Sequence, residues 1–222
     1  MYYRRPLHVL SGVYRPLPTE RYIMMTMGGY WPIIQKLHNG HLGVVTRDSD
    51  FHVGERGRLV FVHSPDGGES WSHSIVISEE GSDNRNPAFG VTSKGTLLAS
   101  FIKQVNYTDG VYDKVHLKPT PLYLSRSEDH GKTWTTELAK VDGNDEFIVG
   151  SPFGKMLTLS DGRIMMHYHL HGLTGFITSD DDGHTWGKPT VISDGGYNET
   201  GLCDLGDGIF MAVFRDNKDL CL

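Results

Sequence analysis

The chain has 222 residues, a formal net charge of −6 and a sequence pI near 6.0, so its charge gives no support for binding to nucleic acid or to an anionic membrane surface. No apolar run approaches about 18 residues, and we therefore expect no transmembrane helix. With 27 glycines, 10% aromatic residues and no long helical periodicity, the composition is typical of an all-β protein with many tight turns.

The first 28 residues are the least regular part of the chain. Leu7–Leu10 and Tyr22–Met25 are expected to form strands on either side of the Pro-rich turn Arg15–Pro18. Arg4 and Arg5 are not followed by an apolar core, so no signal peptide is visible and the compartment stays open. The two cysteines, Cys203 and Cys221, are expected to be free thiols on non-neighbouring strands.

One motif, Ser-x-Asp-x-Gly-x-Thr-Trp, occurs three times and is called a box below. The boxes are Ser64–Trp71 (with Ser70 in place of Thr), Ser127–Trp134 and Ser179–Trp186. In such a turn the Asp carboxylate can accept hydrogen bonds from backbone N–H groups, and the Gly can take a positive φ. The Trp that ends each box begins the next strand, and we expect it to pack in the core rather than to stack on a sugar.

The boxes alternate with Gly turns, and the two together indicate a repeat. The Gly turns are Asn39-Gly40, Lys94-Gly95, Asp161-Gly162 and Asp207-Gly208. A four-stranded unit of roughly 40–50 residues plus loop insertions is typical of a β-propeller blade. The chain 1–222 is therefore predicted to be one partial propeller, with N-terminal strands in 1–28, antiparallel blades at about 30–78, 86–141 and 151–193, and the first half of a blade at 198–222.

A chain of about three and a half blades is expected to be a piece of a longer propeller. Its open edge would favour self-association. Strand alternation places the Gly turns and the boxes on one face and the remaining loops on the opposite rim. Because variable loops on a rigid scaffold usually carry the site, we expect it on that rim, formed by residues 47–56, 82–86, 104–118, 167–171, 197–199 and 215–217.

From about residue 30 to residue 216 the chain resembles the sialidase (neuraminidase) superfamily, whose members carry Asp-box or BNR repeats. The markers are the three boxes together with Asn86-Pro87, Ser151–Met156, Leu159–Arg163 and Asn198-Glu199 followed by Arg215. The resemblance implies a six-bladed propeller that removes terminal sialic acids with retention. It implies a Tyr nucleophile activated by a Glu, an Asp as acid/base and three Arg that bind the substrate carboxylate.

Carried over by motif, Glu199 would activate the nucleophile and Arg215 would be the second carboxylate-binding Arg, a role that suits the guanidinium fork. The position of the first Arg is occupied by Tyr30-Trp31-Pro32, and the third Arg and the Tyr nucleophile are expected beyond residue 222. Asp50 is the predicted acid/base. The other candidates in the same loop are Asp48, His52 and Glu55.

The remaining candidates each have a structural alternative. Arg85 and Asp83 could bind a ligand anion or form a pair that orders the loop. Alternating imidazoles on a strand need no metal, so we expect no metal site at His167, His169 and His171. The predicted substrate-binding residues are Arg215, Arg47, Arg85, Asp83, His52, Tyr30 and Trp31.

These observations predict an exo-acting glycoside hydrolase that removes a terminal, acidic sugar from a glycan without a cofactor. The identity of the sugar stays open because the first Arg is missing. Two alternatives remain: a non-catalytic glycan-binding propeller, and a propeller glycosidase or polysaccharide lyase that uses His52 or a Tyr on a different sugar. If the missing blades carry the nucleophile, the 222-residue chain should be inactive by itself.

Overall fold

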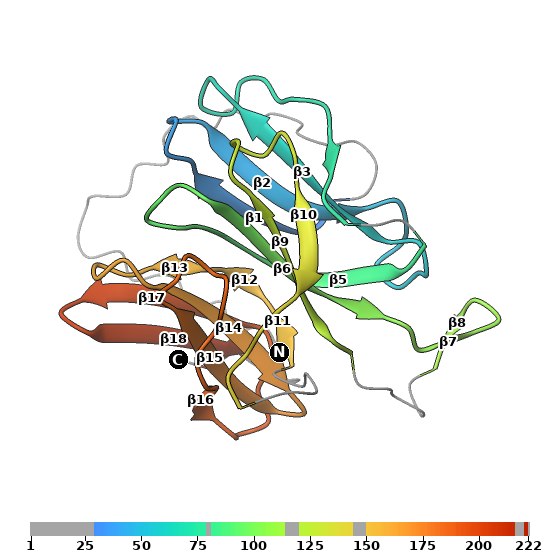
Figure 1. Ribbon diagram of the computed structural model, residues 1–222. Helices are drawn as coiled ribbons and strands as arrows, with labels where there is room; N and C mark the ends of the chain where they lie inside the picture. Colours follow the sequence, from blue (N-terminus) through green and yellow to red (C-terminus); the bar gives the residue numbers. More distant parts are fainter. Residues whose placement is uncertain (1–28, 79–80, 114–119, 144–149, 216–219, 222) are drawn as a thin grey trace, which may run out of the picture.

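The computed structural model describes residues 29–78, 81–113, 120–143, 150–215 and 220–221. This part of the chain consists of strands and loops without a helix, as the sequence predicts (Figure 1). The described residues accordingly contain no helix long and apolar enough to cross a membrane. The strands expected within residues 1–28 lie outside the described residues.

Four sheets follow one another along the chain. The first has the order β1 (Tyr30–Lys36), β2 (Leu42–Asp48), β3 (Arg58–Ser64) and β4 (Ile75–Val76). The second has the order β10 (Thr135–Leu138), β9 (Leu122–Ser127), β6 (Leu97–Gln104), β5 (Asp83–Val91) and β12 (Gly154–Lys155). A separate hairpin, β7 (Tyr107–Thr108) and β8 (Val111–Tyr112), projects from the second sheet at the right of Figure 1.

The third sheet has the order β11 (Ser151–Pro152), β14 (Ile164–Leu170), β15 (Leu173–Ser179) and β16 (Thr190–Ser193), and β13 (Leu157–Thr158) also pairs with β14. The fourth consists of β17 (Thr200–Gly206), β18 (Ile209–Arg215) and β19 (Leu220–Cys221). Cys203 on β17 and Cys221 on β19 are thus separated by β18, and Cys203 is an exposed free thiol, as predicted.

The uniform four-stranded antiparallel unit expected from the repeat is not what the second and third sheets show. The segment 151–158 is divided into three short strands, and the middle one, β12, pairs in parallel with β5 of the second sheet. Pro152 has no backbone N–H, and Gly154 has a φ of +76°, so this segment cannot continue as one regular strand. It therefore joins the second sheet to the third.

The Gly turns between the first two strands of each repeat unit share one geometry. The backbone N–H of Gly40, Gly95 and Gly162 donates to the carbonyl three residues earlier, at 3.0, 2.9 and 3.0 Å. In the fourth turn Asp207 and Gly208 both have positive φ, 52° and 75°, as a two-residue hairpin turn with the right twist requires.

The core lies between successive sheets rather than within one of them. Phe61, Phe89 and their neighbours fill the space between the first and second sheets. Leu98, Met166 and Trp186 belong to the cluster between the second and third sheets. A smaller cluster around Leu157 and Met165 contacts Leu202 of the fourth sheet. Face-to-face packing of sheets about an apolar core fixes their relative positions and so fixes which loops meet.

The fourth sheet leaves large apolar side chains in solvent. Leu205 and Ile209 are 59% and 60% exposed, and Phe210 and Met211 are also exposed. Apolar side chains grouped on one outer sheet are typical of a surface that another element covers. Self-association through this edge stays a prediction.

Candidate active site

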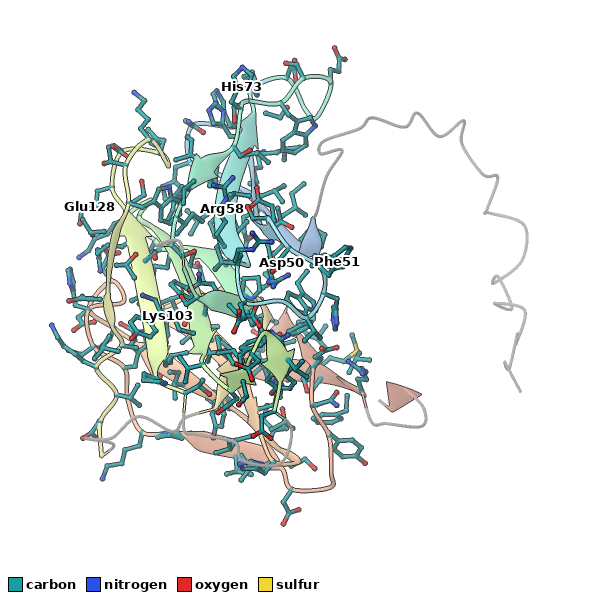
Figure 2. The ribbon with its side chains drawn as sticks, turned by 90° about the vertical axis from the view of Figure 1, so that its right-hand side faces the viewer. Asp50, Phe51, Arg58, His73, Lys103 and Glu128 are labelled. Atoms are coloured by element: carbon teal, nitrogen blue, oxygen red, sulfur yellow. The ribbon has the colours of Figure 1, made fainter. Side chains whose placement is uncertain are left out.

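The Gly turns and the boxes lie on the same face of the molecule. A cavity of about 430 Å³ is lined by residues of both sets: His38, Lys94, Gly95, Thr96, Glu128, His130, Asp182 and His184. Thr96 donates to Asp182 of the third box at 2.7 Å, which joins a Gly turn directly to a box. Figure 2 shows Glu128, from the second box, on the opposite side of the view from Asp50 and Phe51. The loop 47–56 is therefore remote from the box face.

The three boxes have the same internal hydrogen bonds. In the third box the Asp181 carboxylate accepts from Ser179 Oγ at 2.7 Å, from the Thr185 backbone N at 2.8 Å and from Thr185 Oγ1 at 2.6 Å. Asp129 and Asp66 make the equivalent bonds in the other two boxes. These bonds lower the pKa of Asp66 to about 2, chiefly through the Ser70 hydroxyl. All three carboxylates are thus occupied in shaping turns.

The three Trp residues of the boxes are buried to different degrees. Trp186 is 2% exposed and belongs to the core between the second and third sheets, whereas Trp134 is half-buried against Phe61 at 5.5 Å between ring centroids. Trp71 is half-buried as well. None of the three lies on the rim predicted to carry the site.

On that rim a buried ion cluster joins the first two sheets. Arg47, at the end of β2, donates from Nη2 to Asp83 Oδ1 at 2.8 Å, and both side chains are 0% exposed. Asp83 also pairs with Arg85 and accepts a hydrogen bond from the Tyr107 hydroxyl. Burial, followed by the Asp83 carboxylate, raises the pKa of Tyr107. Asp83 is therefore the acceptor on which two guanidinium groups and a phenol converge.

This burial argues against direct substrate binding by Arg47. Its guanidinium also donates to the carbonyl oxygens of Phe51 and Gly54, the latter at 2.9 Å, so it organises the loop 47–56 from within. Arg85 is only 12% exposed and lies over the Tyr112 ring, with its guanidinium carbon 5.1 Å from the ring centroid. For Asp83 and Arg85 the loop-ordering alternative fits this geometry better than the binding of a ligand anion.

Asp50, the predicted acid/base, is engaged with its own loop. Its carboxylate accepts from the backbone N of Phe51 at 2.8 Å and from that of Arg56 at 3.0 Å. The Arg56 hydrogen bond is the main cause that lowers the pKa of Asp50. A carboxyl group held ionised in this way is poorly suited to donate a proton at neutral pH. Asp48 is likewise paired, with Arg58 Nε at 2.8 Å.

His52 has a different environment. Its exposed ring contacts Trp31 and Tyr30, at 4.9 and 5.6 Å between ring centroids. Trp31 has a φ of +53°, and the register of β1 against β2 shifts at this point, so the backbone here is irregular. Tyr30, Trp31 and His52 thus form a half-exposed aromatic group next to the buried Arg47, whose guanidinium carbon is 5.9 Å from the Trp31 ring centroid.

A further contact links the second and third sheets along the same rim. Asn86, with a φ of +51°, lies within an irregularity of β5 and donates from Nδ2 to Ser151 Oγ at 2.7 Å. Ser151 is paired with His169 across β11 and β14. Asn86-Pro87 and Ser151-Pro152 are visible in the sequence as strand-opening markers, but nothing in the sequence shows that they meet.

Glu199 and Arg215 form an ion pair at the end of the fourth sheet. Arg215 Nη1 donates to Glu199 Oε2, and the side chains are 48% and 25% exposed, respectively. The half-buried His169 faces this pair. Burial lowers the pKa of His169 to about 4, while Glu199 acts to raise it and Arg215 to lower it. Arg215 keeps donors that solvent or a ligand can reach.

The predicted site residues therefore fall into two groups. One comprises Tyr30, Trp31, Arg47, Asp50, His52, Asp83 and Arg85, and the other comprises Glu199 and Arg215. Within the described ranges no hydrogen bond or ion pair joins Glu199 or Arg215 to Asp50 or His52. Sequence reasoning missed Tyr107 and Tyr112, the contact between Asn86 and Ser151, and the closeness of His169 to Glu199. The Asp109-Gly110 turn signal, with both residues at positive φ, could have identified the Tyr107–Tyr112 hairpin.

The predicted histidine alternation is only partly observed. His167 and His169 lie on β14 with their rings stacked at 6.0 Å, but His171 lies beyond the strand in an exposed turn with a φ of +48°. Among the residues that the structure describes, no group of three or more His, Cys, Asp or Glu side chains is arranged to hold a metal ion.

A second cavity, of about 790 Å³, lies beside the third box between Leu138–Asp142 and Trp186. Two of its charged residues are already paired, Lys140 with Glu137 at 3.6 Å and Arg163 with Asp161 at 2.7 Å. It is larger than the box-face cavity, yet neither Glu199 nor any residue of the loop 47–56 lines it. This larger cavity is therefore separate from the predicted site residues.

No family model matches the sequence. A sialidase from Micromonospora viridifaciens is 27% identical over 143 residues, which cover 59% of this chain and 20% of that protein. The Hadza microbial sialidase Hz136 superposes with a TM-score of 0.70 at 21% identity, over 87% of this chain and 43% of its own. The resemblance to the sialidase superfamily is confirmed.

A third comparison extends the sialidase-like fold to a liganded structure. Trypanosoma rangeli sialidase, solved in complex with sialic acid, superposes with a TM-score of 0.60 at 17% identity, over 86% of this chain and 34% of its own. This sialidase-like chain thus spans a fifth of its curated relative and less than half of these two structures. At these identities the structural likenesses concern the fold.

Proposed function

We propose that the protein is an exo-acting glycoside hydrolase related to sialidases, with its site on the rim that carries Glu199 and Arg215. The observation that carries this proposal is the Glu199–Arg215 ion pair, which stands half-exposed at the start of β17 and the end of β18. A carboxylate and a guanidinium with open donors can activate a nucleophile and bind an anionic substrate group. The similarity to the Micromonospora viridifaciens sialidase supports the same reaction class.

We further infer that the four sheets are consecutive blades of a six-bladed propeller, the last of them incomplete. The ranges 30–78, 86–141, 151–193 and 198–222 would be the blades. Face-to-face packing through three successive cores supports this arrangement. The chain also covers 43% of the Hadza sialidase, which leaves room for further blades. In this arrangement the rim would surround the propeller axis.

Each rim residue then has a proposed role. Glu199 activates the nucleophile, and Arg215 binds the carboxylate of the terminal sugar. Because Asp50 is held ionised by backbone N–H groups, we assign the acid/base role to His52, whose exposed ring rests on Tyr30 and Trp31. Imidazole is the side chain best suited to proton transfer near neutral pH. Glu55, which is exposed in the same loop, is the alternative.

The proposed substrate is a glycan with a terminal acidic sugar. The Trypanosoma rangeli sialidase binds sialic acid, and Arg215 offers the matching charge here. Tyr30-Trp31-Pro32 occupies the position expected for the first Arg, and Arg47 nearby is fully buried, so the carboxylate would rest on fewer guanidinium groups than the superfamily pattern implies. The aromatic group at Tyr30 and Trp31 would instead contact the apolar face of the sugar ring.

Release of a fluorogenic sialoside by the full-length protein tests this assignment. Glu199→Gln should lower kcat by roughly 10²–10⁴-fold, the range expected when a proton-transfer group is lost. Arg215→Ala should chiefly raise KM. Glu128→Gln, on the box face and 72% exposed, is the matched control and should leave both parameters unchanged. Absence of turnover by the wild type would contradict the sialidase assignment, and normal turnover by Glu199→Gln would contradict the residue roles.

A non-catalytic glycan-binding propeller is the second candidate. The half-exposed Tyr30, Trp31 and His52 group favours it, because aromatic rings of this kind bind sugars without any chemistry. Calorimetric binding of a sialoside without turnover, lost in Trp31→Ala, would support this candidate instead. A glycosidase or lyase acting on another sugar would be recognised by turnover of a different glycan that depends on His52.

A further inference from the structure

Three buried side chains from three strands form a continuous hydrogen-bond chain behind Glu199. His167 on β14 is 1% exposed, Thr174 on β15 is 0% exposed and Thr200 on β17 is 2% exposed. His167 Nε2 lies 2.7 Å from Thr174 Oγ1, and Thr174 Oγ1 lies 3.1 Å from Thr200 Oγ1. Thr200 Oγ1 donates to the backbone carbonyl of Asn198 at 2.6 Å. The chain therefore joins the third sheet to the residue that precedes Glu199.

The direction of this chain follows from proton counting. Each hydroxyl has one proton, and Thr200 gives its own to the Asn198 carbonyl, which can only accept. The Thr174 hydroxyl has two acceptors in reach, Thr200 Oγ1 at 3.1 Å and the Tyr168 carbonyl at 3.4 Å; the shorter contact, in which two facing acceptors would repel, favours donation to Thr200, and with either acceptor the Thr174 proton is not available to His167. Because the Thr174 proton is used in this way, His167 must donate from Nε2, and its neutral ring carries the proton on Nε2 rather than on Nδ1.

Asn198, where the hydrogen-bond chain ends, is also bonded through its backbone N–H. The backbone N of Asn198 donates to the Arg215 carbonyl at 2.9 Å. The Asn198 carbonyl and N–H are thus both bonded, one to the buried chain and one to the strand that carries Arg215. The two residues whose side chains form the surface ion pair are held by these two backbone bonds. Buried hydrogen bonds in a low-dielectric interior are strong enough to fix such a geometry.

We propose that His167, Thr174 and Thr200 are positioning residues that hold the Asn198-Glu199 backbone, and through it the Glu199 carboxylate, in its orientation toward Arg215. The catalytic consequence rests on the proposed function, but the hydrogen-bond chain itself does not. Removing the Thr200 hydroxyl would interrupt this hydrogen-bond chain and leave the Asn198 carbonyl without its donor. Restoring the hydroxyl without the extra methyl group would repair it.

Nuclear magnetic resonance of the chain tests the hydrogen-bond direction without any assay of activity. Long-range ¹H–¹⁵N spectra at pH 7 should show His167 as the Nε2-protonated tautomer. Amide exchange at Asn198 should be roughly tenfold faster in Thr200→Val, because the Asn198 carbonyl loses its donor and the segment opens more often. Thr200→Ser should restore wild-type exchange, and Thr178→Val, half-buried on the same β15 strand as Thr174, should not change it.

An Nδ1-protonated His167 in the wild type, or unchanged Asn198 exchange in Thr200→Val, would overturn the proposal.

Kinetics of the full-length protein on the fluorogenic sialoside then separate positioning from stability. Thr200→Val should lower kcat roughly tenfold at a temperature where the variant is fully folded, with little change in KM, because a displaced group loses its near-attack geometry. Wild-type kcat in that folded variant would overturn the positioning role. Absence of turnover in the wild type would refute the proposed function only, since the tautomer and exchange results stand apart from it.

Discussion

The box carboxylates that shape the turns and the charged groups of the rim are stabilised in different ways, although the box face also has long-range bonds, such as those of Asp182 with Thr96 and Arg126. Each box is closed by bonds within eight residues, such as the three bonds that Asp181 accepts from Ser179 and Thr185. The rim is closed by bonds between distant segments. Arg47 reaches Asp83 across 36 residues, and Asn86 reaches Ser151 across 65.

This difference indicates which charged side chains can be replaced without a large loss of stability. A box carboxylate at the surface can be satisfied by water when its partners are lost, so its removal should act locally. A rim charge such as Arg47 has no access to water, and removal of its partner leaves a buried charge uncompensated. Stability should therefore depend on the rim more than on the conspicuous repeated motif.

The largest expected effect is that of Asp83→Asn. The substitution keeps the volume but removes the charge that balances the fully buried Arg47, so the free energy of unfolding should fall by about 3–5 kcal/mol. Equilibrium denaturant unfolding of the chain measures this change. The double variant Arg47→Met with Asp83→Leu should recover only part of the loss, because the Arg47 charge no longer needs a partner but Arg85 and the Tyr107 hydroxyl still lose their acceptor.

Asp161→Asn serves as the control for this comparison. Asp161 also pairs with an arginine, Arg163, at 2.7 Å, but the two side chains are 50% and 48% exposed. Exposed pairs contribute little, so this variant should unfold close to the wild type. If Asp83→Asn were as mild as Asp161→Asn, the rim cluster would not be the buried anchor that the structure indicates.

The second expected effect is a loss of stability in mild acid that originates at the rim. Burial lowers the pKa of His167 to about 3 and that of His169 to about 4, with His169 adding to the shift of His167. Since both values lie below the ordinary 6.5, stability is fully present above about pH 6.5 and is lost as the pH falls toward the folded values. The slope is at most about 1.4 kcal/mol per pH unit for each imidazole.

Unfolding experiments between pH 7 and pH 4.5 measure this slope. Glu199 and Arg215 are the charged groups that face His169, and they act in opposite directions on its pKa. His167→Gln should reduce the slope of unfolding free energy against pH by the contribution of one imidazole. His73 is exposed next to the first box (Figure 2), so His73→Gln should leave the slope unchanged. The box carboxylates affect stability at lower pH. The pKa of Asp66 and that of Asp181 are lowered to about 2, so the stability that these two carboxylates contribute is lost as the pH falls from about 4 to about 2. A flat profile down to pH 4.5 would contradict the lowered pKa values of the two imidazoles.

The same contrast explains how much of the fold the sequence predicts. The Gly turns and boxes are local patterns, so the all-β class, the order of the strands and the shared face of Gly40 and Ser127 can be deduced from residues a few positions apart. The division of 151–158 into three strands cannot be deduced in this way. It depends on β5 accepting β12 as a parallel neighbour, a contact across more than sixty residues of sequence.

For the candidate site, the sequence predicts the residue types but not their state of burial. Arg47 and Arg215 look alike in the sequence, yet one is fully buried and the other is 48% exposed. Asp50 looks like a free loop acid until the backbone N–H groups of Phe51 and Arg56 are seen to occupy it. Such differences arise from the folded loop, which residue spacing does not determine.

The smallest expected effect is that of Asp181→Ala in the third box. The variant loses three hydrogen bonds, to Ser179 and Thr185, in a turn that water can reach, so the free energy of unfolding should fall by about 1–2 kcal/mol. Asp180→Ala is the matched control, since the adjacent exposed carboxylate takes no part in these bonds, and it should stay within about 0.5 kcal/mol of the wild type. Because the second box has the same bonds, Asp129→Ala should lose about as much. A loss at Asp181 equal to that of Asp83→Asn would show that the boxes contribute as much to stability as the rim does, and would contradict the contrast between them.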